Sequence, residues 1–194
     1  MPKTRLEAFS DAVIAIVMTV MVLELSTPHG ANWGALRPLV PKFLTYALSF
    51  AFLGIYWSNH HHLIQACKRV NGRILWANLH LLFWLSLTPF VTGWMGENHF
   101  ASTPSAAYGI VLLLSAVAYY ILQTAILAAH GPDFPLKAAL GSDVKGKISP
   151  LLYIAAIPLA FVNRWIALGI YVFVALMWLV PDKRIESMIE ETVE

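Results

Sequence analysis

The chain has 194 residues, of which 58% are hydrophobic and only 12% are charged, whereas about a quarter of the residues of a soluble domain carry charge. Together with a mean hydropathy of +0.65, this composition excludes an ordinary soluble domain and indicates a membrane protein. The net charge of +2 is too small to indicate a nucleic-acid-binding surface, and the single cysteine excludes an internal disulfide and a multi-cysteine metal site.

Apolar segments follow one another along the chain and predict an all-α, polytopic membrane protein with six transmembrane helices. Crossing about 30 Å of hydrocarbon takes about 20 helical residues, and the first four segments have that length. The last two are shorter and form either two helices or one broken helix; Asn163-Arg164, Pro158 and Pro181 favour two. The segments are 7–26, 39–62, 73–95, 106–129, 149–163 and 165–181.

The basic residues of the connecting segments predict the orientation. With the N-terminus inside, ten of the 13 Lys and Arg residues fall on inner segments, as the positive-inside rule requires. We therefore expect a transmembrane domain over 1–181, a polar cytoplasmic tail over 182–194, and both termini in the cytoplasm. The inner residues are Lys3, Arg5, Lys68, Arg69, Arg73, Lys137, Lys145, Lys147, Lys183 and Arg184; the outer ones are Arg37, Lys42 and Arg164.

The first segment carries charges in a helix that is otherwise almost wholly apolar, RLEAFSDAVIAIVMTVMVLEL from Arg5 to Leu25. Because an α-helix turns about 100° per residue, Ile16, Val20 and Leu23 form one narrow aliphatic stripe. Asp11 lies about 140° from Ile16, so it faces different partners.

Asp11 is expected to point into the helix bundle, because an ionisable group in hydrocarbon is costly unless it faces protein or water. Two interpretations stay open: Asp11 is a structural cap and hydrogen-bond hub, which suits the positive end of the helix dipole, or it carries a proton or an ion. The aliphatic stripe is either ordinary helix packing or part of a pore. Glu24 is either a solvated end residue or a cation-attracting group at the outer mouth.

Candidate partners for Asp11 lie on the second and third segments, at the same depth in the membrane. The second segment ends in YWSNHHHL, which includes Tyr56 and Trp57, and the third contains WANLHLLFWLSLTPF. Consecutive histidines do not face one another on a helix, so we expect no metal site there; instead, one histidine is expected to bond Asp11 or Asn78. The residues at this depth are Arg5, Ser10, Asp11, His60, His61, His62, Asn78 and His80.

The sequence contains no Gly-x-Ser-x-Gly, no Gly-rich phosphate loop and no His-Glu-x-x-His, which are common catalytic motifs. We therefore expect no enzymatic activity and no cofactor. The potassium-filter sequence Thr-Val-Gly-Tyr-Gly is also absent, so a channel built from this chain would not use a filter of backbone carbonyls.

The pattern Arg5-x-x-x-Phe9-Ser10-Asp11, followed by AVIAIVMTVMVLEL, resembles the signature of the transmembrane protein 175 family, potassium-permeable channels of lysosomes with prokaryotic relatives. The histidine-rich end of the second segment and NLHLLFWLSLTPF of the third resemble the family too, so the first half of the chain carries the match. Because the motif occurs once, the resemblance implies a prokaryotic, plasma-membrane homotetramer of six-helix subunits, in which the first helices line a central pore that passes K⁺.

The resemblance also implies roles for individual residues. Ile16, Val20 and Leu23 would form the pore constriction, and Thr19 would influence ion preference. Val20 stands where we expect leucine, which predicts a looser constriction. A structural network would tie the first helix to the second and third; its members are Arg5, Phe9, Ser10, Asp11, His60, His61, Trp76, Asn78 and His80.

The function that we expect is passive conduction by a potassium-permeable cation channel. A ring of aliphatic side chains gates by dewetting, and it discriminates potassium from sodium only weakly or moderately because it cannot replace a hydration shell. Two alternatives stay open: a proton-coupled secondary transporter that uses Asp11 and an inner histidine, and a membrane scaffold protein without ion flux.

Overall fold

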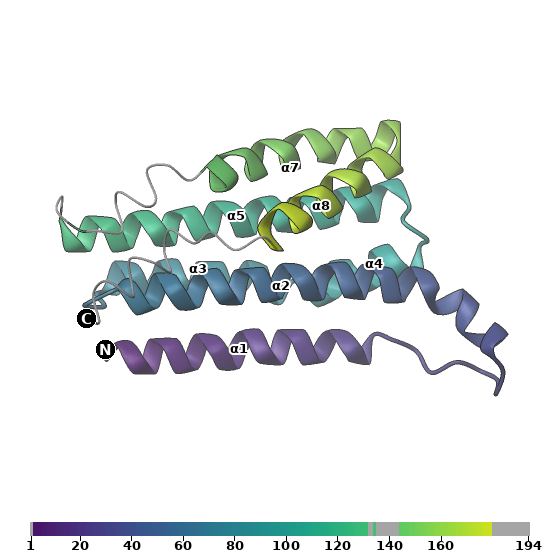
Figure 1. Cartoon of the computed structure of the whole chain (residues 1–194), viewed down its shortest axis with the longest axis horizontal. Coiled ribbons are helices and arrows are strands. Elements are labelled where there is room, and N and C mark those ends of the chain that lie inside the picture. Colours follow the sequence, from purple (N-terminus) through teal and green to yellow (C-terminus); the bar gives the residue numbers. More distant parts are fainter. Residues whose placement is uncertain (1, 132–133, 135–143, 180–194) are drawn as a thin grey trace.

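The computed structural model describes residues 2–131, 134 and 144–179, in which the chain forms a bundle of long helices running in alternating directions (Figure 1). This arrangement confirms the predicted all-α membrane fold. The elements are α1 (Lys3–Leu23), a 3₁₀-helix η1 (Trp33–Leu39), α2 (Val40–Ala66), α3 (Gly72–Ser86), α4 (Thr88–Glu97), α5 (Ser102–His130), α7 (Val144–Val162) and α8 (Arg164–Leu179).

Five stretches of the described residues are long and apolar enough to cross a membrane: α1, η1 with α2, α3 with α4, α5, and α7. The sixth, α8, is apolar but has only 16 residues, about 24 Å at 1.5 Å per residue. The helices α7 and α8 are separated at Asn163, whose side-chain oxygen accepts a hydrogen bond from the backbone N–H of Trp165 at 3.0 Å. The last two apolar segments are therefore two helices, as expected.

The third apolar segment is divided, which its hydropathy did not predict. Leu87 ends α3 and caps α4, and Pro89 lies in the first turn of α4. Proline has no backbone N–H and its ring clashes with the preceding turn, so it is tolerated where a helix starts. The helices α3 and α4 together form one span, Gly72–Glu97.

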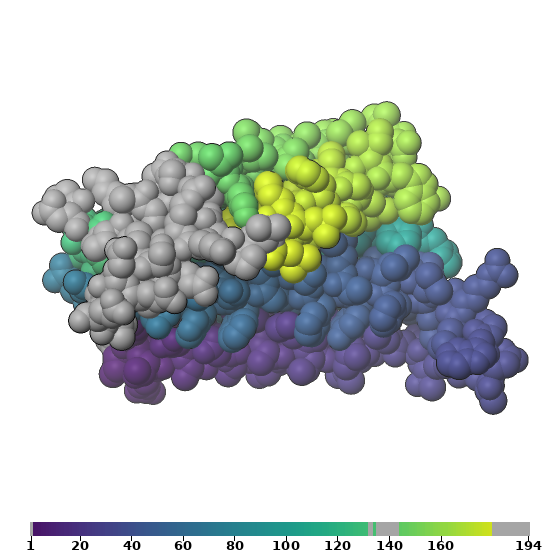
Figure 2. Space-filling view, viewed as in Figure 1, coloured from purple at the N-terminus to yellow at the C-terminus, as the bar shows by residue number. Residues whose placement is uncertain are grey.

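The helix α1 lies along one edge of the bundle, where Figure 2 shows it as a continuous purple strip. Its buried face packs against α2, α3 and α4. The buried residues recur about once per helical turn, so they form a single stripe. They are Leu6, Ser10, Ile14, Val17 and Met21.

A second core lies between α5, α7 and α8, where Gly109 allows a close approach. A Cβ atom at Gly109 would overlap the hydroxyl of Tyr171 and stand 2.9 Å from Cζ of the same ring. Tyr171 is fully buried, and its hydroxyl donates to the backbone oxygen of Ser105 at 3.0 Å. Burial and the hydrogen bond of its hydroxyl therefore fix the Tyr171 ring, which has little room to move away from an added Cβ atom.

We expect Gly109→Ala to lower the free energy of unfolding by about 1–3 kcal/mol, because overpacking a tight core has that cost. Thermal unfolding of the purified protein in detergent measures this loss. Gly54→Ala is the matched control, since a Cβ atom there meets no other atom within 4 Å. An equal loss in the two variants would contradict the close approach.

Basic residues gather at the end of the bundle where α1 begins, which we call the basic end. Its described members are Lys3, Arg5, Lys68, Arg69, Arg73, Lys145 and Lys147. Contacts join the helix ends there: Lys3 Nζ donates to the Gln65 backbone oxygen at 2.6 Å, and Arg69 donates to that of Ala129 at 2.7 Å. Arg37, Lys42 and Arg164 lie at the opposite end. Lys137, Lys183, Arg184 and the tail over 182–194 lie outside the described residues.

Cys67, the single cysteine of the chain, lies just after α2 at the basic end and is 1% exposed. Burial raises the pKa of its thiol, against the opposing effects of the hydrogen bond to the Arg69 backbone oxygen and the charge of Lys3. Because the thiolate is the reactive form, we expect maleimide to label the native protein about ten-fold or more slowly than the unfolded chain at neutral pH. Mass spectrometry of timed samples measures both rates; equal rates would contradict the burial.

Candidate functional site

The aliphatic stripe of α1 faces away from the rest of the chain. Ile16 is 60% exposed, Val20 is 37% exposed and Leu23 is 79% exposed. On the opposite face of the same helix, Ile14 and Met21 are buried in the core. The helix thus has one face fixed within the protomer and one aliphatic face that is open to lipid or to another copy of the chain.

Thr19 and Glu24 flank this stripe. The Thr19 hydroxyl lies within hydrogen-bonding distance of the backbone oxygens of Ala15 (3.0 Å) and Ile16 (2.9 Å) and donates its one proton inside the helix. Its oxygen keeps acceptor capacity for a group outside the helix. Glu24 is exposed and caps the end of α1, where the helix dipole disfavours a negative charge; its carboxylate leans towards Gly93 of α4.

A buried chain of hydrogen bonds, which we call the inner rung, joins α1, α2 and α3. The ring nitrogen Nε2 of His60 lies 2.7 Å from Oδ1 of Asn78, and Nδ2 of Asn78 donates to the Ser10 hydroxyl at 2.9 Å. Ser10 in turn donates to the backbone oxygen of Leu6 at 2.8 Å. Since Oδ1 of Asn78 can only accept, Nε2 of His60 carries the proton. His60, Asn78 and Ser10 are all 0% exposed.

Two further contacts between α1 and α2 form an outer ladder. The indole nitrogen of Trp57 donates to Oδ1 of Asp11 at 3.0 Å, and Nδ1 of His61 lies 3.3 Å from Oε1 of Glu7. The rings of Trp57 and His61 stack with their centroids 6.1 Å apart. Glu7 and Asp11 are four residues apart on α1, and Trp57 and His61 are four residues apart on the antiparallel α2. The two contacts therefore lie one helical turn apart.

Comparisons with known proteins match the part of the chain that holds these contacts. The family described as "Endosomal/lysosomal potassium channel TMEM175" matches residues 5–89, which hold the inner rung and the outer ladder. A potassium channel of Chryseobacterium sp. (strain P1-3) is 54% identical over 191 residues, which are 98% of this chain and 100% of that protein. The chain belongs to the TMEM175 family.

Two more TMEM175 relatives extend the likeness. A potassium channel of Streptomyces collinus (strain DSM 40733 / Tue 365) is 29% identical over 187 residues, which are 90% of each chain. The crystal structure of a lysosomal potassium-selective channel TMEM175 homolog from Chamaesiphon minutus has a TM-score of 0.79 at 26% identity, and the match covers 92% of this chain and 96% of that one. The family is one of ion channels and not of enzymes, so the assignment made from the sequence motif is confirmed.

Two neighbouring residues of the TMEM175 motif, Ser10 and Asp11, belong to different sets of contacts. The expected bond from one histidine to Asp11 or Asn78 is made by His60 to Asn78, and the Asp11 carboxylate accepts from Trp57, a candidate partner on the second segment. Ser10 and Asp11 are neighbours and therefore point about 100° apart; Ser10 faces the core and Asp11 faces the rim of α2. The four-residue spacing of Trp57 and His61 on α2 matches that of Glu7 and Asp11 on α1, and this is the sequence signal for the two contacts.

Some residues expected in the network lie outside it. Trp76 is 72% exposed, and His80 accepts a hydrogen bond from Trp84 of its own helix at 2.9 Å. Both are two positions from Asn78, about 200° around α3, so they face the opposite side. Phe9 is 49% exposed. Within the described part of the chain, the side chain of Arg5 has no hydrogen-bond or ion-pair partner.

In the described ranges, the histidines are not grouped with other side chains that could ligate a metal ion. Among the residues that the structure describes, no three or more His, Cys, Asp or Glu side chains are placed to hold a metal ion. Buried Nδ1 atoms of His60 and His62 have no hydrogen-bond partner in this part of the chain. His60 instead bonds Asn78 of α3, and His61 lies beside Glu7 of α1.

Proposed function

We propose that this TMEM175 protein is a potassium-permeable cation channel in which four copies of the chain place α1 around a central pore. The names of its relatives support potassium as the permeant ion: the Chryseobacterium protein is a potassium channel, and the Chamaesiphon structure is that of a potassium-selective channel. One observation carries the residue assignment. Ile16, Val20 and Leu23 are exposed on a helix whose opposite face is buried.

In this proposal, the inner rung and the outer ladder hold α1 in one rotation about its axis. The exposed stripe then meets its copies on the symmetry axis and forms an aliphatic constriction. Such a ring blocks ions by dewetting when it is narrow and passes hydrated or partly hydrated ions when it is wide. Thr19 offers an oxygen beside Val20, which gives it a place to act on ion preference, and Glu24 attracts cations at the outer mouth.

The distribution of charge supports an orientation. The basic end faces the cytoplasm of a prokaryotic cell, because Lys and Arg residues are retained on the inner side of the plasma membrane. The N-terminus of the transmembrane domain 1–181 then lies inside, and with six spans the tail 182–194 does so as well. Glu24 and the ion pair between Lys42 and Glu97, 2.9 Å long, lie on the outer side.

Potassium efflux from liposomes separates the channel from a proton-coupled transporter through Asp11→Asn. The amide oxygen of Asn can still accept from Trp57, so a channel should keep most of its passive flux, within about three-fold, since replacing a hydrogen bond of this kind costs about 1 kcal/mol or less. A transporter that uses the Asp11 carboxylate would lose its coupled flux.

The control is wild-type protein in liposomes with and without a protonophore that collapses the proton gradient. Flux that persists with the protonophore supports a channel. Flux that requires an imposed proton gradient and disappears in Asp11→Asn would favour the transporter, and protein that gives no flux under either condition would favour a scaffold.

A further inference from the structure

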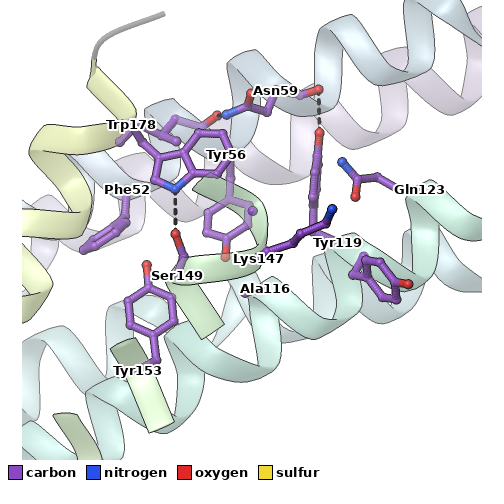
Figure 3. Close-up of a pocket in the computed structure, with 13 residues that line it drawn as sticks. Phe52, Tyr56, Asn59, Ala116, Tyr119, Gln123, Lys147, Ser149, Tyr153 and Trp178 are labelled. Carbon is purple, nitrogen blue, oxygen red and sulfur yellow. Dashed lines mark hydrogen bonds between the residues drawn. The ribbon is translucent and has the colours of Figure 1, made fainter. Parts of the chain in front are cut away.

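A partly open cavity of about 100 Å³ lies between α2, α5, α7 and α8, apart from α1 and its contacts (Figure 3). A cavity of this size is large enough for a small group or a few water molecules. Its wall combines aromatic side chains with a few polar ones. The lining residues on which the argument rests are Phe52, Asn59, Ala116, Gln123, Lys147 and Tyr153.

The wall changes from apolar to polar in the same direction on three helices. Along α2 it runs from Phe52 to Asn59, and along α5 from Ala116 to Gln123. Both helices end at the basic end of the bundle, so their polar lining residues are the ones nearer that end. On α7, which begins there, Lys147 comes before Tyr153. All three helices thus give the cavity a polar rim towards the basic end and an apolar floor towards the middle of the bundle.

The apolar floor is rigid. Phe52 and Tyr153 are 3% and 2% exposed, and their rings meet edge to face with centroids 6.4 Å apart. Beside them, the indole nitrogen of Trp178 donates to the Ser149 hydroxyl at 2.9 Å, which fixes α8 against α7. The floor therefore keeps its shape and offers hydrocarbon and aromatic surface to an apolar group.

The polar rim brings a positive charge and an amide to the same depth. Asn59 lies seven residues before the end of α2, which is about 10 Å along the helix from the basic end. Lys147 and Gln123 line the cavity with it (Figure 3). Within the described part of the chain, the Gln123 amide makes no hydrogen bond, so both its donor and its acceptor are available to a ligand.

We propose that this cavity binds an anionic glycerophospholipid of the surrounding leaflet. Its phosphate lies at Lys147 and Gln123, and the first part of an acyl chain lies against Phe52 and Tyr153. Basic pockets between transmembrane helices on the cytoplasmic side suit anionic headgroups, and the lysine stem packs on apolar surface while its ammonium reaches the phosphate. A phospholipid fits both parts because its charged phosphate can lie at the polar rim while the attached acyl chain lies on the apolar floor.

Native mass spectrometry of the purified, delipidated protein tests this site with phosphatidylglycerol and phosphatidylcholine of identical acyl chains. We expect wild-type protein to retain phosphatidylglycerol about five-fold better, the factor that one lysine near an anionic lipid gives. Lys147→Ala should remove this preference and Lys147→Arg should keep it. Lys68→Ala, which removes a charge at the same end but away from the cavity, should leave it unchanged.

Ala116→Phe tests the apolar floor without changing charge, because it fills the cavity and should reduce retention of both lipids. Val117→Phe is its control, since Val117 is 39% exposed and does not line the cavity. An unchanged preference in Lys147→Ala, or unchanged retention in Ala116→Phe, overturns the proposal. Displacement of phosphatidylglycerol by an equal concentration of glycerol 3-phosphate also overturns it, because the site would then bind a soluble phosphate.

Discussion

Ile16→Asn and Leu23→Asn should each raise potassium flux into liposomes by about ten-fold, which corresponds to a barrier lower by about 1.4 kcal/mol. A ring of aliphatic side chains repels water from a narrow pore, and an amide in that ring holds water and so lowers the barrier to ion entry. Both residues lie on the exposed stripe of α1, so the substitution leaves the buried face of the helix unchanged. Flux is measured with a potassium-sensitive dye at fixed voltage.

Val22→Asn is the matched control for these two variants. Val22 is 46% exposed on the same helix, but it lies about 120° from Ile16 around the helix axis. We expect its flux to equal that of wild-type protein. Light scattering on each purified variant reports whether the proposed tetramer forms as in wild-type protein. If it does, unchanged flux in the stripe variants, or an equal rise in Val22→Asn, would place the pore elsewhere.

Asn78→Leu should lower the free energy of unfolding by about 1–3 kcal/mol, because it leaves the buried N–H of His60 without an acceptor. The inner rung loses its middle member, while the number and branching of the side-chain heavy atoms are kept. We expect a fall in the thermal midpoint of about 2–4 °C for each kcal/mol. We also expect less of the proposed tetramer and less potassium flux, because α1 loses its hydrogen bond to α3.

Asn98→Leu separates this effect from the general loss of an amide. Asn98 is exposed after α4 and donates only to the Trp94 backbone oxygen within the described part of the chain, at 2.9 Å. Its substitution should change the midpoint by less than about 1 °C, as is usual for surface positions. If Asn78→Leu unfolds at the same temperature as wild-type protein, the inner rung does not hold α1.

The sequence was sufficient to predict the helices because the thickness of the bilayer sets their length. The first four apolar segments match α1, α2, α3 with α4, and α5, with ends that differ by a few residues. The break at Leu87 was missed because hydropathy does not register a missing N–H, although Pro89 marks it. The 3₁₀-helix η1 was missed as well: it is too short for a periodic pattern, and the side chain of Asn32 caps it by accepting from Ala35 N–H at 3.1 Å.

The site could be predicted only as far as one helix determines it. Helical angles correctly separated Asp11 from Ile16, but the partner of Asp11 depends on the register between α1 and α2, which no spacing on α1 contains. His60 and Asn78 were expected to be close because they share a depth, and they bond at 2.7 Å. The lipid cavity could not be predicted, since four helices contribute to it and each contributes ordinary apolar or polar residues.

The outer ladder and the inner rung would respond differently if α1 slid along α2. A slide of one turn, about 5.4 Å, brings either Glu7 opposite Trp57 or Asp11 opposite His61, so a carboxylate still meets a donor. The same slide brings Leu6 or Ile14 opposite Asn78 and leaves its buried Nδ2 donor without the Ser10 acceptor, which costs far more. The outer ladder alone would therefore allow α1 to shift by one turn relative to α2. The hydrogen bond between Ser10 and Asn78 opposes this shift.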